Sequence, residues 1–229
     1  MIGFRKKSAP TVTAGLFGKV PGFGDFLAEG LSRAFTDVLD GWIREGFRIA
    51  GEHPDSNDRY MCSPVWRFAF AQQLAGRHSW VGVISPSVDS VGRSFPLVIA
   101  FRAPSVPLTD LERAERLCQR ALEDDYDTLD AWRGEVLSLS TSEAESDVPA
   151  LIAPERGGKL RAVSADGELL QSYSMAGPDP YVFARMIGWL PQAATQPGPE
   201  TPPRDILAET VGGLHSAPHT PPREGSDPW

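Results

Sequence analysis

Two short apolar runs separated by a polar connector form the clearest hydrophobic pattern in the chain. Trp80–Ile84 and Phe95–Phe101 are rich in Val, Ile and Phe, and runs of this composition and length are typical of buried strands. The connector between them is rich in Ser, Pro, Asp and Gly, which favour turns. The pattern predicts two neighbouring antiparallel strands joined by a loop that is too long for a two-residue hairpin.

The residues before this pair predict one strand and two helices. Thr11–Val20 is expected to be the first strand. Apolar residues at steps of three and four predict an amphipathic helix from Leu31 to about Ala50. Ser63-Pro64 offers an N-cap followed by proline at the first helical position, so a short helix is expected from there through Leu74.

The residues after the pair predict two helical segments and a hairpin. Thr109–Glu112 has the form of a capping box, which predicts a long helix or a helix pair up to about Leu137. Lys159–Val163 and Glu168–Tyr173 fit a small hairpin. Pro178–Leu190 fits a final helix.

These elements predict a single α/β domain from about residue 11 to 190. Its sheet is expected to be antiparallel or mixed, with helices on both faces, in an αβα sandwich. Residues 1–10 are expected to be a mobile lead-in. Residues 191–229 are rich in proline and poor in large apolar residues, which predicts a disordered C-terminal tail.

Composition narrows the classes of function. The chain has 229 residues and a net charge of −8, which argues against a general nucleic-acid binder because such proteins carry a basic face. It contains no apolar run of about 18 residues, so no membrane insertion is expected. Cys62 and Cys118 are too few for a disulfide framework or a Cys-based zinc site, which favours a cytoplasmic location.

The search for catalytic and cofactor motifs gives no match. Lys19 is followed by Val20, so the phosphate-binding loop spacing is absent. Gly22 and Gly24 lack the third glycine of the dinucleotide fingerprint. With His53 and His78 the only histidines of the expected folded part, a histidine-based hydrolase is the least supported class. No catalytic residue, metal ligand or cofactor is therefore assigned.

Four charged residues stand in two turn-rich loops, each of which follows an expected buried strand. They are Lys19, Asp25, Asp89 and Arg93. Asp89 could pair with Arg93 within its own loop, or the four could form a structural cluster in which Asp25 pairs with Arg93 and Asp89 with Lys19. They could instead form a partner-binding surface, or Lys19 and Arg93 could bind a small anionic ligand such as phosphate with backbone amides.

Several short motifs between Leu16 and Phe101 resemble, in their order, the TagF (ImpM) family associated with bacterial type VI secretion. The motifs are Gly18-Lys19-x-Pro21-x-x-Gly24-Asp25-Phe26, Trp42, Tyr60, Ser63-Pro64-x-Trp66-Arg67-Phe68, Trp80-x-Gly82-Val83 and Pro86-Ser87-Val88-Asp89-x-Val91-Gly92-Arg93-x-Phe95-Pro96-Leu97. The chain departs from the family in its C-terminal half, where the family's Trp-Trp pair is missing and Lys159–Val163 stands in roughly that place.

The resemblance implies a cytoplasmic, non-enzymatic accessory protein with an α/β sandwich fold. It implies a post-translational negative regulator of the assembly of the secretion apparatus, which acts by protein–protein interaction with a forkhead-associated-domain protein as its partner. Trp66 is expected in the core and Arg67 at the surface. Arg93 and Asp89 are expected to contribute more to binding of the partner than to stability of the fold. The predicted partner-binding residues are Lys19, Pro21, Gly24, Asp25, Phe26, Arg67, Ser87, Asp89, Gly92 and Arg93.

Overall fold

The fold was analysed in a computed structural model that describes residues 12–51, 55–141, 148–164 and 166–188. All of these residues lie within one compact unit, residues 1–190. The predicted mobile lead-in, residues 1–10, and the predicted disordered tail, residues 191–229, lie outside the described residues.

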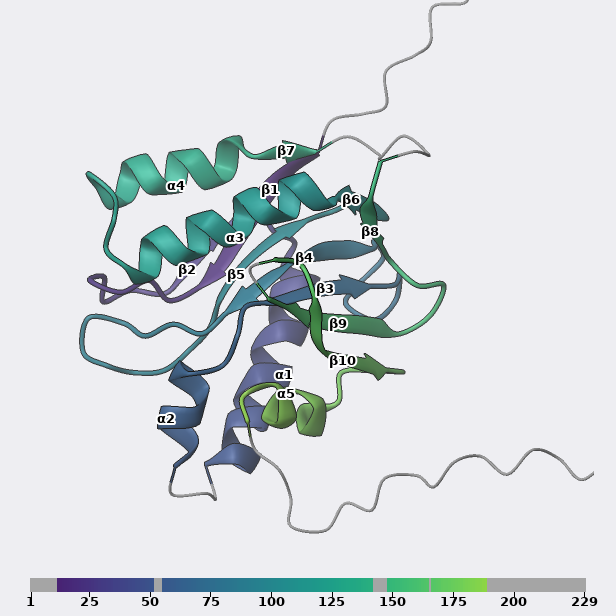
Figure 1. The fold of residues 1–229 in the computed structure, drawn as a ribbon, viewed down its shortest axis with the longest axis horizontal. Helices are drawn as coiled ribbons and strands as arrows, with labels where there is room; N and C mark the ends of the chain where they lie inside the picture. The colour runs from purple at the N-terminus through teal and green to yellow at the C-terminus, as the bar shows by residue number, and fades with distance from the viewer. Residues whose placement is uncertain (1–11, 52–54, 142–147, 165, 189–229) are drawn as a thin grey trace, which may run out of the picture. The chain divides into compact units, whose positions relative to one another are not determined.

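One large antiparallel sheet forms the middle layer (Figure 1). Its strands follow the order β10-β9-β3-β4-β5-β1-β2, and β7 also pairs with β1. A second, two-stranded sheet joins β6 to β8. The strands are β1 (Val12–Gly18), β2 (Leu27–Glu29), β3 (Trp66–Phe70), β4 (Trp80–Ser85), β5 (Leu97–Phe101), β6 (Ser105–Pro107), β7 (Ser140–Thr141), β8 (Ala150–Ile152), β9 (Gly158–Val163) and β10 (Leu169–Met175).

Helices cover both faces of the large sheet, as an αβα sandwich requires. Figure 1 shows α3 and α4 on one side of the sheet and α1 and α5 on the other. Each side has its own core of buried side chains, one around Trp42, Trp66 and Trp80 and the other around Trp132. The helices are α1 (Arg33–Ala50), α2 (Ser56–Met61), α3 (Leu108–Leu122), α4 (Leu129–Ser138) and α5 (Pro180–Met186). The predicted fold class is confirmed.

Helix α1 forms where its apolar stripe predicts it. Phe35, Leu39, Trp42 and Ile43 lie on one face and are buried, so the stripe packs against the sheet. The side chain of Ser32 caps the start of the helix by accepting a hydrogen bond from the Phe35 amide at 3.4 Å.

The helix predicted from Ser63-Pro64 through Leu74 is wrong, because this segment contains strand β3. Its residues pair with β4 on one side and with β9 on the other. Trp66, Phe68 and Phe70 alternate along it and lie in one core, which is the two-residue period of a strand. The hydroxyl of Ser63 caps no helix and donates instead to the Tyr60 carbonyl at 2.7 Å.

The C-terminal elements agree with the predictions in type and differ at their ends. A helix pair forms, but α3 starts at Leu108 and shows no side-chain cap, so the predicted capping box is wrong. Thr128 instead caps α4, accepting from the Ala131 amide at 3.1 Å. The hairpin is present as β9 and β10. Helix α5 starts two residues later than predicted because Asp179 caps it.

The contact between α1 and α5 predicts opposite effects for two glycines of the same helix. A Cβ added at Gly46 would lie 2.5 Å from Cδ1 of Phe183, whereas one added at Gly41 meets nothing within 4 Å. Gly46→Ala is expected to lower the free energy of unfolding by about 1–3 kcal/mol through overpacking. Gly41→Ala is the control and is expected to raise it by about 0.5–1 kcal/mol. Urea unfolding of both variants checks this, and a stabilised Gly46→Ala would contradict the described packing.

Candidate functional site

Two loops meet at one end of the sheet because of the strand order. Strands β1 and β4 both pair antiparallel with β5, so they run in the same direction. The loop Lys19–Phe26 after β1 and the loop Pro86–Ser94 after β4 therefore leave the sheet at the same end. The two loops lie at the same end only because of this strand order, and no local pattern in the sequence reveals the strand order.

The carboxylate of Asp89 joins the two loops. Its Oδ2 accepts hydrogen bonds from Lys19 Nζ at 2.7 Å and from Arg93 Nε at 2.6 Å. Its Oδ1 accepts from the backbone amides of Val91 at 3.1 Å and Arg93 at 2.8 Å. The side chain of Asp89 is 0% exposed, so all four donors stabilise a charge that water does not reach.

The hydrogen bonds keep this buried group ionised. Burial by itself raises the pKa of Asp89, but the bonds from Lys19 and from the side chain and amides of the loop outweigh it and hold the pKa well below its usual range. Lys19 is only 13% exposed and its ammonium lies on Asp89. The arrangement therefore speaks against Lys19 as a binding group for phosphate or another anion.

Ser87 and Tyr60 fasten the same loop from beneath. Ser87 Oγ donates to the Lys19 carbonyl at 2.8 Å. The Tyr60 hydroxyl donates to the Ser87 carbonyl at 2.8 Å and accepts from the Ser87 amide at 2.7 Å. Burial raises the pKa of Tyr60, and the hydrogen bond with Ser87 opposes this only in part. Tyr60 thus acts as a neutral anchor that ties α2 to the loop.

Aromatic rings and backbone contacts complete the junction. The ring of Phe26 stands edge-on to Phe17 and to Phe95, with centroid distances of 4.8 and 4.9 Å. The amide of Ser90 donates to the Phe23 carbonyl at 3.2 Å. These contacts hold the first loop against the second, and they leave Phe26 38% exposed.

The two loops present a mixed surface to solvent. Val91 is 71% exposed and the side chain of Arg93 is 65% exposed. Phe26 and Asp25 are exposed beside them. We call these four residues, Asp25, Phe26, Val91 and Arg93, the loop surface. Apolar groups next to charges, held on a rigid support, suit contact with another protein.

The structure corrects part of the predicted charge cluster. The pair of Lys19 with Asp89 and the pair of Asp89 with Arg93 within one loop are both confirmed. The alternative pair of Asp25 with Arg93 is wrong, because Arg93 pairs with Asp89 instead. Ser87 and Asp89 are buried, so the expectation that Asp89 stands at the surface is wrong. The reason is that the tight turn at Gly92, with φ +81°, folds the loop back over the carboxylate.

Two other predicted site residues, Pro21 and Gly24, contribute backbone carbonyls to the site. Pro21 is partly buried, and its carbonyl accepts a hydrogen bond from the Tyr126 hydroxyl at 3.1 Å. Gly24 is exposed, and its carbonyl lies 3.4 Å from Arg93 Nη2. Val91 belongs to a family motif but is not among the predicted partner-binding residues. Its signal in the sequence is a lone apolar residue between Ser90 and Gly92 in a turn, which indicates exposure.

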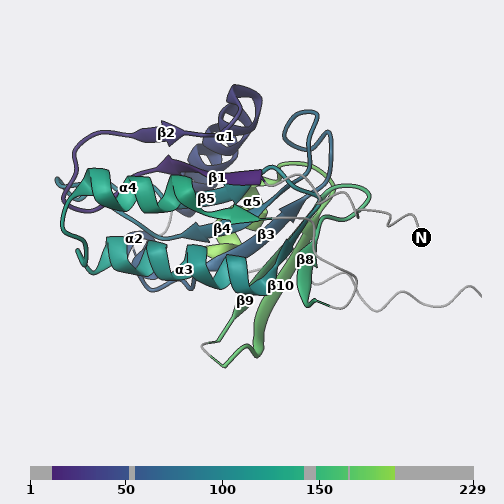
Figure 2. The same ribbon diagram turned by 90° about the horizontal axis from the view of Figure 1, so that it is seen from above.

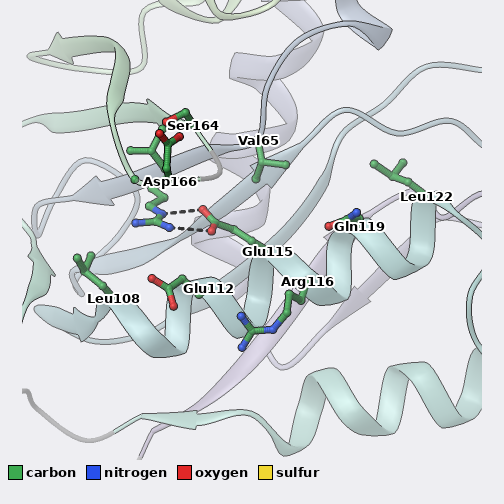
Figure 3. A pocket seen from close by; sticks show the side chains of 12 residues that line it. Val65, Leu108, Glu112, Glu115, Arg116, Gln119, Leu122, Ser164 and Asp166 are labelled. Carbon is green, nitrogen blue, oxygen red and sulfur yellow. Dashed lines mark hydrogen bonds and ion pairs between the residues drawn. The ribbon is translucent and has the colours of Figure 1, made fainter.

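Arg67 lies apart from the loop surface. It belongs to β3 and pairs with Glu115 of α3 through two bonds, Nε to Oε1 at 2.6 Å and Nη2 to Oε2 at 2.8 Å. Figure 3 marks these bonds as dashed lines at the labelled Glu115. Arg67 is partly buried, with 11% of its side chain exposed, so it lies at the border of a cavity rather than on the open surface. The pair borders a cavity of about 650 Å³ that includes Leu108, Glu112 and Asp166 and no residue of the two loops.

In the described part of the chain, no group of three or more His, Cys, Asp or Glu side chains could hold a metal ion. No helix there is long and apolar enough to cross a membrane.

Comparison with known families gives a match over the part that carries both loops. The pattern of the family described as "TagF N-terminal domain, Type VI secretion system-associated" matches residues 15–131. The chain belongs to this family. The match extends beyond the motifs noted in the sequence and includes α3 and the start of α4. The segment that matches the TagF family therefore contains helices from both faces of the sheet.

A solved structure has a similar fold. The crystal structure of PA0076 from Pseudomonas aeruginosa PAO1 is similar, with a TM-score of 0.62 and 25% sequence identity. The similarity covers 81% of this chain and 99% of PA0076. No curated protein matches the chain.

The state of Asp89 predicts how the stability of this TagF-family domain depends on pH. Its folded pKa lies below the value of about 3.9 for an unfolded aspartate, so its contribution is present above about pH 4 and is lost as the pH falls further. Asp89→Asn is expected to lower the melting temperature at pH 7 and to flatten its decline below pH 4. Melting curves from pH 2 to 7 measure this.

Asp25→Asn is the matched control, because Asp25 is an exposed aspartate of the neighbouring loop. It is expected to melt like the parent protein at each pH. An Asp89→Asn protein with the parent's full pH dependence would show that Asp89 does not act as a buried ionised group.

Proposed function

We propose that this protein is a cytoplasmic, non-enzymatic accessory protein that negatively regulates assembly of a type VI secretion apparatus after translation. It acts by binding another protein of the system, and the proposed partner is a forkhead-associated-domain protein. Membership of the TagF family supports the secretion context. The regulatory role and the partner go beyond that membership.

The observation that carries the proposal is the construction of the loop surface. The hydrogen bonds of Asp89 and Tyr60 hold two loops in place. Phe26, Val91 and Arg93 remain exposed. A rigid support reduces the conformational entropy lost on binding, so such a surface is suited to a protein partner. The guanidinium of Arg93 has five N–H groups. Asp89 accepts from Nε and the Gly24 carbonyl from Nη2, so the remaining N–H groups can donate to a partner.

The proposal predicts that binding and stability separate at the loop surface. Arg93→Ala and Val91→Asp are each expected to weaken binding of the purified partner at least about tenfold. Val91 is 71% exposed, so Val91→Asp should change the melting temperature by less than about 4 °C. Arg93→Ala also removes one of the donors to the buried carboxylate of Asp89, so this variant is expected to melt at a lower temperature as well. Isothermal titration calorimetry and thermal melting of the same samples measure the two effects.

Arg33→Ala and Val148→Asp are the matched controls, since Arg33 is 92% and Val148 43% exposed outside the loop surface. Both should keep the parent's affinity. Unchanged affinity in Arg93→Ala and Val91→Asp would refute the assignment of the loop surface. A rise in melting temperature with inorganic phosphate, lost in Arg93→Ala, would favour an anion sensor instead.

A further inference from the structure

Strand β10 forms one edge of the large sheet and carries few of the features that normally protect an edge. It pairs with β9 on one side, and within the described residues no strand pairs with its other side. Its sequence, Leu169–Met175, contains no charged residue and no proline. Natural edge strands are usually blocked by such residues, so β10 offers free backbone groups to another strand.

The side chains along this edge are exposed as well. Leu169 is 60% and Leu170 is 56% exposed, although large apolar side chains on a strand normally face a core. The register shifts between Leu169 and Gln171, so the only irregularity lies at the start of the strand. The stretch from Gln171 to Met175 pairs regularly with β9 and leaves five residues for strand addition.

One face beside the edge is basic. Lys159 and Arg161 of β9 lie directly opposite Ser174 and Ser172 of β10. Both cations are exposed, and neither forms an ion pair within the described part of the chain. Arg161 also lies opposite Arg67, an arrangement of like charges that is unfavourable in a sheet. Glu115 neutralises Arg67, but Arg161 has no such partner.

No helix shields these cations. Figure 2 shows β9 and β10 extending beyond the cover of α3 and α4. Neighbouring strands lie about 4.8 Å apart, so an added strand would lie about 10 Å from β9. Extended Lys and Arg side chains span most of that distance across the small serines. Carboxylates on the same face of the added strand would meet Lys159 and Arg161.

The other face of the edge is hollowed. A cavity of about 280 Å³ lies against Gln171 and Tyr173 and is also lined by Pro64, Met186, Arg59 and Arg185. Arg59 donates to the Gly188 carbonyl at 2.8 Å. Side chains alternate in a strand, so every second residue of an added strand would point toward this mostly apolar cavity.

We propose that β10 is a docking edge for an extended acidic segment of another protein, which adds to the sheet as a further strand. Its carboxylates lie over Ser172 and Ser174 near Lys159 and Arg161, and its apolar side chains enter the cavity beside Tyr173. Charge complementarity selects this occupant, because the edge is basic in a chain whose net charge is −8. The site does not include the loop surface.

The test uses a labelled ten-residue peptide that alternates valine and glutamate, and the full-length protein. Fluorescence anisotropy is expected to show binding that weakens as salt is raised from 50 to 500 mM, because salt screens exposed charges. The same peptide with N-methyl groups on alternate residues keeps its charge but loses backbone donors, so it should not bind. A valine-lysine peptide should not bind either.

Charge reversal in the protein tests the basic face. Lys159→Glu/Arg161→Glu changes only exposed side chains and is expected to weaken binding of the valine-glutamate peptide at least about tenfold. Arg33→Glu/Arg44→Glu reverses two exposed charges on α1 and should leave binding unchanged. Circular dichroism confirms that both variants fold.

Three outcomes would overturn the proposal. They are no binding of the valine-glutamate peptide, equal binding of its N-methylated form, and full affinity in Lys159→Glu/Arg161→Glu. Light scattering tests the remaining occupant, a second copy of the chain. A dimer that becomes monomeric in Ser174→Pro, while the valine-glutamate peptide fails to compete, would assign the edge to self-association. The peptide result does not depend on the secretion partner, so it stands or falls separately from the proposed function.

Discussion

A buried carboxylate that must be neutralised is the constraint on which the candidate site depends. An ionised group without water is costly unless hydrogen bonds and opposite charges surround it. Asp89 meets this requirement with Lys19 from one loop and with Arg93 and two amides from its own. Because the donors come from both loops, satisfying one carboxylate fixes both backbones.

The sheet supplies the scaffold for this junction. Strands β4 and β5 are buried along their whole length, with helices on either face. Gly18 ends β1 with φ +126°, and a Cβ there would lie only 1.9 Å from the Pro96 carbonyl oxygen. This close approach is possible only for glycine, and it brings the start of the Lys19–Phe26 loop against the residues that lead into β5.

The two proposed interaction surfaces would bind their partners through different groups. The loop surface presents side chains whose positions are set in advance by buried hydrogen bonds. The edge of β10 presents backbone groups, and charge beside it, rather than shape, selects the partner. The αβα sandwich leaves both available. Helix α2 holds the Pro86–Ser94 loop through Tyr60, but Phe26, Val91 and Arg93 stay exposed. Among the described residues, no strand pairs with the outer side of β10.

The sequence by itself determined the elements whose signals are local. The stripe of α1, the apolar runs of β4 and β5 and the β9–β10 hairpin could be recognised from composition and periodicity. The motifs around the two loops were recognised by their resemblance to the TagF family. Tertiary structure decided the rest. Trp66–Phe70 became a strand because pairing with β4 and β9 outweighed a helix-start signal at Ser63-Pro64. The ion pairs of Asp89 and Arg67 were also decided by tertiary structure. Their partners, Lys19 and Glu115, lie 70 and 48 residues away in the sequence, and no local pattern encodes contacts over such separations.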